Sequence, residues 1–382
     1  MKRILCILVL VFTTSVIYSQ STDMDYERVK IGEAKHMICG LDLSPDQNVL
    51  AISSMQSFPF YLYDWRKKEK LNEFNVGNWY AGSSIRYSGS GKYILLNQLY
   101  YLDFSPNKDR EVNFELIDAQ SGNRLKRFEN VHSVDLTYDE KYIVALTGDE
   151  VSFYDIKTGS KEKSFTVAEA SNSVAFSPDG KFIAVSHKLY EKDAKNIAQL
   201  QRDKKTLKSA LKYKQQISIF DAENFTKLYT VNELYDIIYN LKFSKDGKNL
   251  LVLHIPHAKM QNIPSSRQTY LNVVDMETAS PKRRGFTSKA DYEPDFKLSH
   301  DGNMLGIVSN NDRFLEVHIY DFETGKMLHR FQQSYRLFEK NEGGMFAVDS
   351  RISFVFTPDD QTLLMTMGNH LIEWNFIKET EK

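Results

Sequence analysis

A unit of strand, turn and strand recurs seven times along the 382 residues of this chain, and such a repeat restricts the fold more than any single motif does. Each copy begins with alternating apolar and polar residues and passes through Ser or Thr into a short turn in which Asp is frequent. A second apolar stretch follows, and the clearest copy spans 173–186. The other copies span 41–53, 85–97, 134–146, 241–253, 296–308 and 354–366. The hydroxyl residues that start the turns are Ser44, Ser88, Thr137, Ser177, Ser244, Ser299 and Thr357.

Two further strands follow in each unit, and we name the four strands A to D in chain order. Strand C ends with Asp in six units and with Asn in the last, and a short turn then leads to strand D. Asp and Asn favour such turns because their side chains bond to nearby backbone N–H groups. Four strands per unit, repeated seven times, are typical of a β-propeller. We therefore predict an all-β fold, a seven-bladed β-propeller of four-stranded blades that spans 26–378.

The turns also suggest a family. The A–B turn at 177–180 is Ser-Pro-Asp-Gly, and related turns occur in the other units. In this respect the chain resembles the WD40-like propeller superfamily, in its bacterial form with Ser-Pro-Asp-Gly turns. The resemblance covers about residues 26–378 and implies the same propeller fold.

The last unit lacks its fourth strand. It offers strands at 351–357, 362–367 and 371–375, followed by a short tail. The segment 26–32 alternates in polarity and precedes the first unit. We predict that this N-terminal strand completes the last blade, because closure leaves no open sheet edge. The alternative is an N-terminal arm outside the ring.

Residues 1–19 resemble a secretory signal peptide. Lys2 and Arg3 precede an apolar run at 4–12, which is too short to span a bilayer, and cleavage is expected after Ser19. The alternative is an uncleaved anchor. We expect an exported protein that is periplasmic, associated with the cell envelope or secreted, with no transmembrane segment in the mature chain. Cys39 would be its one cysteine, so no disulfide could form within it.

The connections of the predicted blades are unequal. The A–B and C–D turns are short, whereas the B–C connections at 98–112, 187–216 and 255–269 and the D–A connection at 333–350 are long. In a propeller the B–C and D–A connections share one face. We predict that this long-loop face binds a partner, because rigid scaffolds display function on loops. The alternative is neutral growth, since surface insertions cost little free energy.

The insertion at 187–216 has nine basic and three acidic residues and no Gly or Pro. We predict a helix or helical hairpin with a basic outer face. Lys204, Lys205 and Lys208 are its candidate contacts to an acidic protein or to membrane headgroups. The alternative is a charged helix that only faces solvent.

Aromatic residues and Arg gather in the other long connections of the same face. These residue types dominate the binding energy of protein interfaces, and aromatics also suit a glycan. Some of them could instead pack beneath their own loops. The candidate partner-binding residues are Trp79, Tyr80, Tyr100, Tyr101, Phe104, Arg110, Tyr335, Arg336 and Phe338.

Strand A should line the central channel, with the residues two and four positions before each hydroxyl pointing inward. The positions two before it are Asp42, Arg86, Asp135, Ala175, Lys242, Lys297 and Val355. The positions four before it are Gly40, Ser84, Ser133, Ser173, Asn240, Asp295 and Ser353. Three Asp face three cations, which favours mutual neutralisation over a calcium site, and neither His nor Glu is present for acid–base work. His254 and His257 alone are too few for a metal site.

The charge balance, the long-loop face and the channel residues together limit the function classes that we expect. The 49 basic and 50 acidic residues leave no basic footprint for nucleic acid. We expect an exported, non-enzymatic scaffold without cofactor or metal, which binds a protein partner through its long-loop face and is a candidate subunit of a bacterial envelope assembly. The alternatives are a propeller enzyme of the lactonase or dehydrogenase type, with its chemistry at the channel mouth, and a glycan-binding module.

Overall fold

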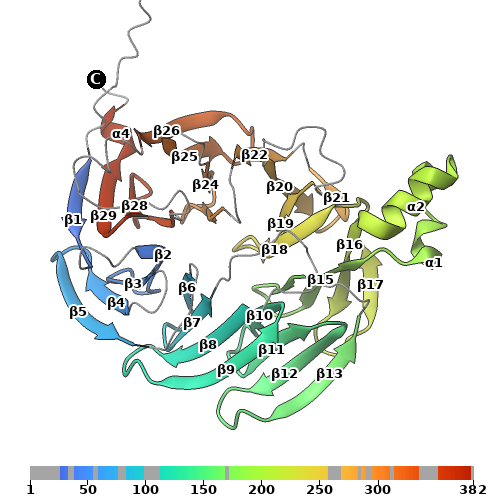
Figure 1. The fold of residues 1–382 in the computed structure, drawn as a ribbon, viewed down its shortest axis with the longest axis horizontal. Helices are drawn as coiled ribbons and strands as arrows, with labels where there is room; N and C mark the ends of the chain where they lie inside the picture. Colours follow the sequence, from blue (N-terminus) through green and yellow to red (C-terminus); the bar gives the residue numbers. More distant parts are fainter. Residues whose placement is uncertain are drawn as a thin grey trace, which may run out of the picture.

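Seven antiparallel sheets form a closed ring around a central channel (Figure 1). The computed structural model describes residues 26–32, 38–54, 59–75, 83–98, 112–167, 172–256, 268–282, 285–289, 294–309, 314–334 and 352–379. In each blade strand A is innermost and strand D outermost. The predicted all-β, seven-bladed propeller is therefore confirmed.

The strands follow the order of the repeat. Blade 1 contains β2 (Ile38–Leu43), β3 (Val49–Ser54), β4 (Phe60–Asp64) and β5 (Glu69–Phe74). Blade 2 contains β6 (Ser83–Tyr87), β7 (Tyr93–Gln98), β8 (Val112–Asp118) and β9 (Arg124–Val131). Blade 3 contains β10 (Ser133–Leu136), β11 (Tyr142–Thr147), β12 (Glu150–Asp155) and β13 (Lys161–Thr166). Blade 4 contains β14 (Val174–Phe176), β15 (Phe182–Lys188), β16 (Gln215–Asp221) and β17 (Lys227–Thr230).

Blade 5 departs from the four-strand pattern at its outer edge. It contains β18 (Ile237–Phe243), β19 (Asn249–Ile255) and β20 (Gln268–Asp275), and two short strands, β21 (Ser280–Pro281) and β22 (Phe286–Lys289), both pair with β20. Blade 6 contains β23 (Phe296–Leu298), β24 (Met304–Val308), β25 (Phe314–Asp321) and β26 (Met327–Ser334). Blade 7 contains β27 (Phe354–Phe356), β28 (Thr362–Met367), β29 (His370–Asn375) and the N-terminal β1 (Glu27–Lys30), and α4 (Phe376–Glu379) follows it.

The N-terminal strand closes the ring as predicted. Strand β1 pairs antiparallel with β29, from Glu27 opposite Glu373 to Lys30 opposite His370. Beyond the paired strand, the Ile31 N–H donates to the Asn369 carbonyl at 2.9 Å. Because β1 occupies the outer edge of blade 7, the ends of the repeat region are joined by backbone hydrogen bonds.

The recurring hydroxyl and Asp build the A–B turns. The Ser177 hydroxyl donates to Asp179 Oδ1 at 2.6 Å and accepts from the Phe182 N–H at 2.8 Å. Gly180 between them has a φ of 72°, which favours glycine. Blade 2 has no Asp in this turn, and Glu140 of blade 3 instead accepts from the Ser90 N–H at 2.5 Å. The turn Asp is therefore structural.

Apolar side chains between neighbouring sheets form the core. Trp374, Phe354 and Phe331 are almost fully buried between blades 6 and 7. Gly306 permits this close approach, because a Cβ at Gly306 would lie 2.5 Å from the Phe354 ring. Burial of each such ring contributes about 1.5–3 kcal/mol, so each blade junction is a stabilising unit.

A helical hairpin projects from blade 4 between β15 and β16 (Figure 1). It contains α1 (Glu191–Ala194), the 3-10 turn η1 (Ala198–Gln201) and α2 (Lys204–Tyr213). Asp203 caps α2, because its carboxylate accepts from the Lys205 and Thr206 N–H groups at 3.0 and 3.1 Å. A small apolar cluster holds the hairpin together, and its buried members are Leu189, Ala194, Leu200 and Ala210.

Across the described ranges, no helix has the length and apolar character needed to cross a membrane.

Candidate functional site

The channel is a cavity of about 990 Å³, which is the size of a small-molecule site. Most of the positions predicted to line it do so. These are Asp42, Ser84, Arg86, Ser133, Asp135, Ser173, Ala175, Asn240, Lys242, Asp295, Lys297 and Ser353.

Two predicted channel positions are wrong. Val355 is buried in the apolar cluster between blades 7 and 1. Gly40 lies against blade 2, where a Cβ would come within 2.9 Å of the Ser83 carbonyl oxygen. Gly40 has no side chain that could extend into the channel, and the apolar side chain of Val355 packs between the sheets instead.

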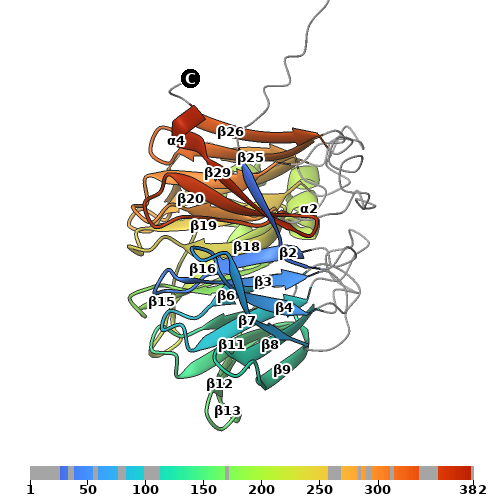
Figure 2. The same cartoon turned by 90° about the vertical axis from the view of Figure 1, so that its left-hand side faces the viewer.

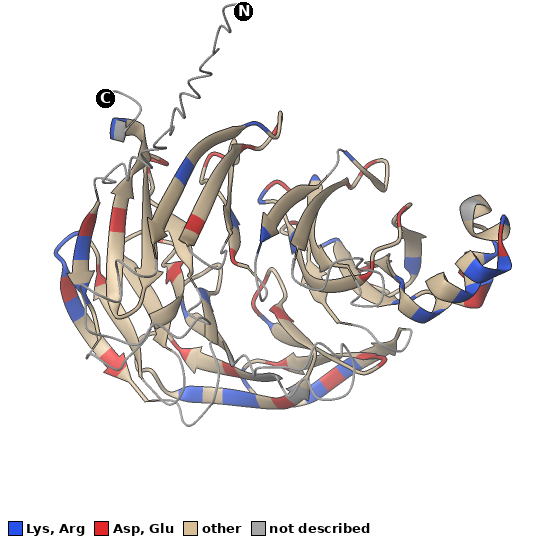
Figure 3. Ribbon diagram, turned by 45° about the horizontal axis from the view of Figure 1, so that its top comes forward, with Lys and Arg blue, Asp and Glu red and all other residues tan. Residues whose placement is uncertain are grey.

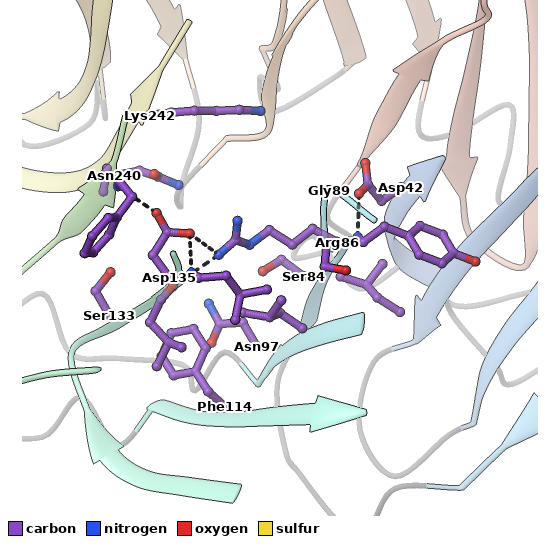
Figure 4. Close-up of a pocket in the computed structure, with 18 of the residues that line it drawn as sticks. Asp42, Ser84, Arg86, Gly89, Asn97, Phe114, Ser133, Asp135, Asn240 and Lys242 are labelled. Carbon is purple, nitrogen blue, oxygen red and sulfur yellow. Dashed lines mark hydrogen bonds and ion pairs between the residues drawn. The ribbon is translucent and has the colours of Figure 1, made fainter. Parts of the chain in front are cut away.

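Charged side chains pair across the channel wall. Arg86 Nη2 lies 2.6 Å from Asp135 Oδ1 (Figure 4). Lys297 Nζ donates to the Leu41 carbonyl at 2.5 Å and lies 3.4 Å from Asp42 Oδ1. Two of the three cations therefore have carboxylate partners.

The channel carboxylates also bind the backbone of the next blade. Asp42 Oδ2 accepts from the Tyr87 N–H at 2.7 Å, and Asp135 Oδ2 accepts from the Phe176 N–H at 2.9 Å. Strand A pairs with strand B on one side only, so the N–H groups on its inner edge have no strand partner. The Asp side chains of the preceding blade satisfy these groups.

Serine hydroxyls also accept inner-edge N–H groups of the next blade, and these serines lie two residues before the Asp position of strand A. Ser173 Oγ accepts from the Leu241 N–H at 3.0 Å, and Ser353 Oγ accepts from the Leu41 N–H at 3.0 Å across the closure of the ring. Sequence reasoning missed this blade-to-blade role. Its signal was present, because Ser recurs four residues before the turn hydroxyl in four of the seven units.

Lys242 is the exception among the channel cations. Its ammonium has no hydrogen bond or ion pair with any part of the chain that the structure describes, and Figure 4 shows its side chain extended over the cavity. The side chain is exposed to solvent, but this solvent is inside the channel that the ring of blades encloses. The loss of hydration in this enclosed position is the main cause that lowers the pKa of the Lys242 ammonium below its ordinary value, and the positive charge of Lys297 is the second. The negative charges of Asp42 and Asp295 oppose the shift.

Within the described ranges, no group of three His, Cys, Asp or Glu side chains is arranged to hold a metal ion. His254 lies between the rings of Tyr235 and Tyr270, at centroid distances of 4.9 and 5.5 Å. Burial lowers the pKa of His254 to about 4, so the imidazole is neutral at pH 7. The other predicted histidine, His257, lies outside the described residues.

The candidate contacts on the long-loop face divide into two groups. Lys204, Lys205 and Lys208 lie on α2, and all three are exposed. Figure 2 shows α2 on the side of the ring where β3 and β26 end, which is the face of the B–C and D–A connections. The candidates that lie outside the described residues are Trp79, Tyr80, Tyr100, Tyr101, Phe104, Arg110, Tyr335, Arg336 and Phe338.

Ion pairs are unevenly distributed over the surface lysines of the described residues. In the blades, Lys161 Nζ of β13 lies 2.8 Å from Glu150 Oε2 of β12, and Lys68 in the turn before β5 pairs with Glu27 of β1. The ammonium groups of Lys204, Lys205 and Lys208 form no such ion pair with the described chain. Figure 3 shows several basic residues on this projecting element, among the charged residues of the blades.

No protein-family model matches the chain, and a search of curated proteins found no significant match.

Proposed function

We propose that this protein is an exported, non-enzymatic β-propeller scaffold that binds an acidic partner protein through its long-loop face, with the helical hairpin as the docking arm. In this proposal the chain is a divergent member of the WD40-like propellers with Ser-Pro-Asp-Gly turns. It acts as a subunit of a bacterial envelope assembly.

The observation that supports the docking arm is a group of cations without ion pairs to the described residues, on an element that packs on itself and on the propeller. The base of the hairpin is tied to blade 4, where Gln216 Nε2 donates to Asp193 Oδ2 at 2.7 Å, and to the connection into blade 5, where Lys214 Nζ lies 2.7 Å from Asp236 Oδ1. Its apolar cluster adds a small core of its own. An element that is already ordered loses little conformational entropy on binding, so its exposed cations can contribute affinity.

The absence of enzymatic chemistry is supported by how the channel carboxylates are used. Asp42, Asp135 and Asp295 each accept hydrogen bonds from the wall of the next blade. A carboxylate held in this way is a poor general base and offers few free oxygens to a cation.

The test compares partner capture by matched charge variants. The tagged mature protein is used to capture partners from envelope extracts of its own cell, at low and high salt, with quantification by mass spectrometry. The triple variant Lys204→Glu, Lys205→Glu, Lys208→Glu should lose captured partners that the wild type retains. The control Lys245→Glu, Lys248→Glu, Lys326→Glu reverses three exposed charges elsewhere and should lose none of them.

Two further measurements are the salt dependence of partner capture and the effect of deleting the hairpin. Capture by the wild type should weaken as salt rises, because exposed charges are screened over about 10 Å at 0.1 M ionic strength. A short Gly/Ser turn in place of 189–214 should leave the fold intact, because β15 and β16 are neighbours in one antiparallel blade. If the deletion and the charge reversal both leave every partner in place, the hairpin is not a docking arm.

A further inference from the structure

The central channel contains one cation for which the wall supplies no partner. Among the channel cations, Arg86 is bound to Asp135 and Lys297 lies between Asp42 and Asp295, at 3.4 and 3.9 Å. Lys242 is the one whose ammonium has neither a hydrogen bond nor an ion pair within the described residues, and it points over the open cavity (Figure 4).

The carboxylates of the channel are not free to turn towards Lys242. Asp42 accepts from the Tyr87 N–H and Asp135 from the Phe176 N–H, each of which is an inner-edge donor of the next blade. Asp295 Oδ2 accepts from the Ser353 hydroxyl at 2.5 Å and from the Phe354 N–H at 3.3 Å. Movement of any of these carboxylates would leave a backbone donor without its acceptor, which costs free energy.

The neighbours of Lys242 around the ring do not compensate its charge. At the same level of the channel, blade 4 presents Ala175 and blade 6 presents Lys297. Enclosure by the blades and the charge of Lys297 therefore disfavour the ammonium and lower its pKa. A negatively charged group in the cavity would reverse this, because an opposite charge stabilises the protonated amine.

We propose that the central channel binds a small organic molecule with a single carboxylate, and that Lys242 holds this carboxylate by a charge-assisted hydrogen bond. A single negative charge fits because Lys242 is the one channel cation without a partner among the described residues, so one negative charge balances it. An organic group fits because Leu95, Phe114 and Tyr239 also line the cavity. The site lies apart from the helical hairpin, so this inference does not depend on the proposed partner binding.

The test titrates the full mature chain with three aromatic probes by isothermal calorimetry at fixed ionic strength. The probes are benzoate, benzyl alcohol as a neutral analogue and phenyl phosphate as a dianionic analogue. Benzoate should bind saturably and more tightly than either analogue. Lys242→Met should weaken benzoate binding by about tenfold or more, as expected for loss of a hydrogen bond to a charged group.

Two variants provide the comparison. Lys245→Met removes an exposed lysine from the neighbouring turn and should leave benzoate affinity unchanged, and Lys242→Arg retains the charge and should retain binding. The proposal is overturned if the wild type binds no benzoate, if benzyl alcohol or phenyl phosphate binds as tightly, or if Lys242→Met binds as the wild type does. The wild-type comparison decides the question even if a variant fails to fold.

Discussion

Replacement of Ser173 by Ala tests the inference that side chains of one blade hold the inner edge of the next. The Ser173 hydroxyl accepts the Leu241 N–H at 3.0 Å, and the two residues are only 3% and 4% exposed. The substitution leaves a buried N–H without its acceptor. We expect a loss of about 1–3 kcal/mol in the free energy of unfolding, the cost of an unsatisfied buried donor.

The assay is urea unfolding followed by far-UV circular dichroism, with the midpoint and slope compared among variants. Ser160→Ala is the control, because Ser160 is exposed in a C–D turn, and its change should stay within about 0.5 kcal/mol. Ser133→Ala removes the acceptor of the Val174 N–H at the preceding blade junction. The double variant should be less stable than either single variant, and any departure from additivity would measure coupling between the two sites, because Val174 directly follows Ser173. If Ser173→Ala is as stable as Ser160→Ala, the hydroxyl contributes nothing and the argument fails.

Three further predictions concern closure, the channel carboxylates and pH. Deletion of residues 21–33 removes β1, and we expect a lower melting temperature and more light scattering from the exposed edge of β29; an unchanged melting temperature would contradict the closure argument. Asp42→Asn and Asp135→Asn should lower stability modestly, by about 1 kcal/mol in urea unfolding, because partly exposed ion pairs contribute little; one tightly held calcium per wild-type chain by elemental analysis, absent from either variant, would show a metal site instead. Lys242→Met should be more stable than the wild type at pH 7. Because the pKa of Lys242 is lower in the folded than in the unfolded chain, its charge disfavours folding at pH values below the folded pKa. This penalty disappears as the pH rises to the pKa of the unfolded chain, so the difference in urea midpoint between variant and wild type should shrink at alkaline pH. If the variant remains equally more stable at alkaline pH, the charge of Lys242 is not the reason.

The blade pattern was predictable from sequence because its causes are local. The turn at 177–180 forms from its own Ser, Asp and Gly, and the alternation of apolar residues around it determines which strand faces reach the core. The same alternation in 26–32 was sufficient to predict that β1 completes blade 7. Blade 5 was predicted less well, because its outer edge is divided between β21 and β22, which both pair with β20.

The pairing of the channel charges could not be predicted from local sequence patterns. Sequence alone placed three carboxylates and three cations along the inner strands, but not their partners. Arg86 meets Asp135 of the next blade, and Lys297 meets Asp42 across the closure of the ring, between residues far apart in the chain. Lys242 has no partner within the described chain because Ala175 and Lys297 are its neighbours around the ring and the channel carboxylates are held by backbone donors.

Sequence by itself therefore determined the number of blades, their strand order and the strand that closes them, because turns and alternation act over a few residues. Tertiary structure decided which charges are paired, which N–H groups are held by the preceding blade and which cation remains open to a ligand. These depend on distances between blades, and those distances exist only once the ring has closed.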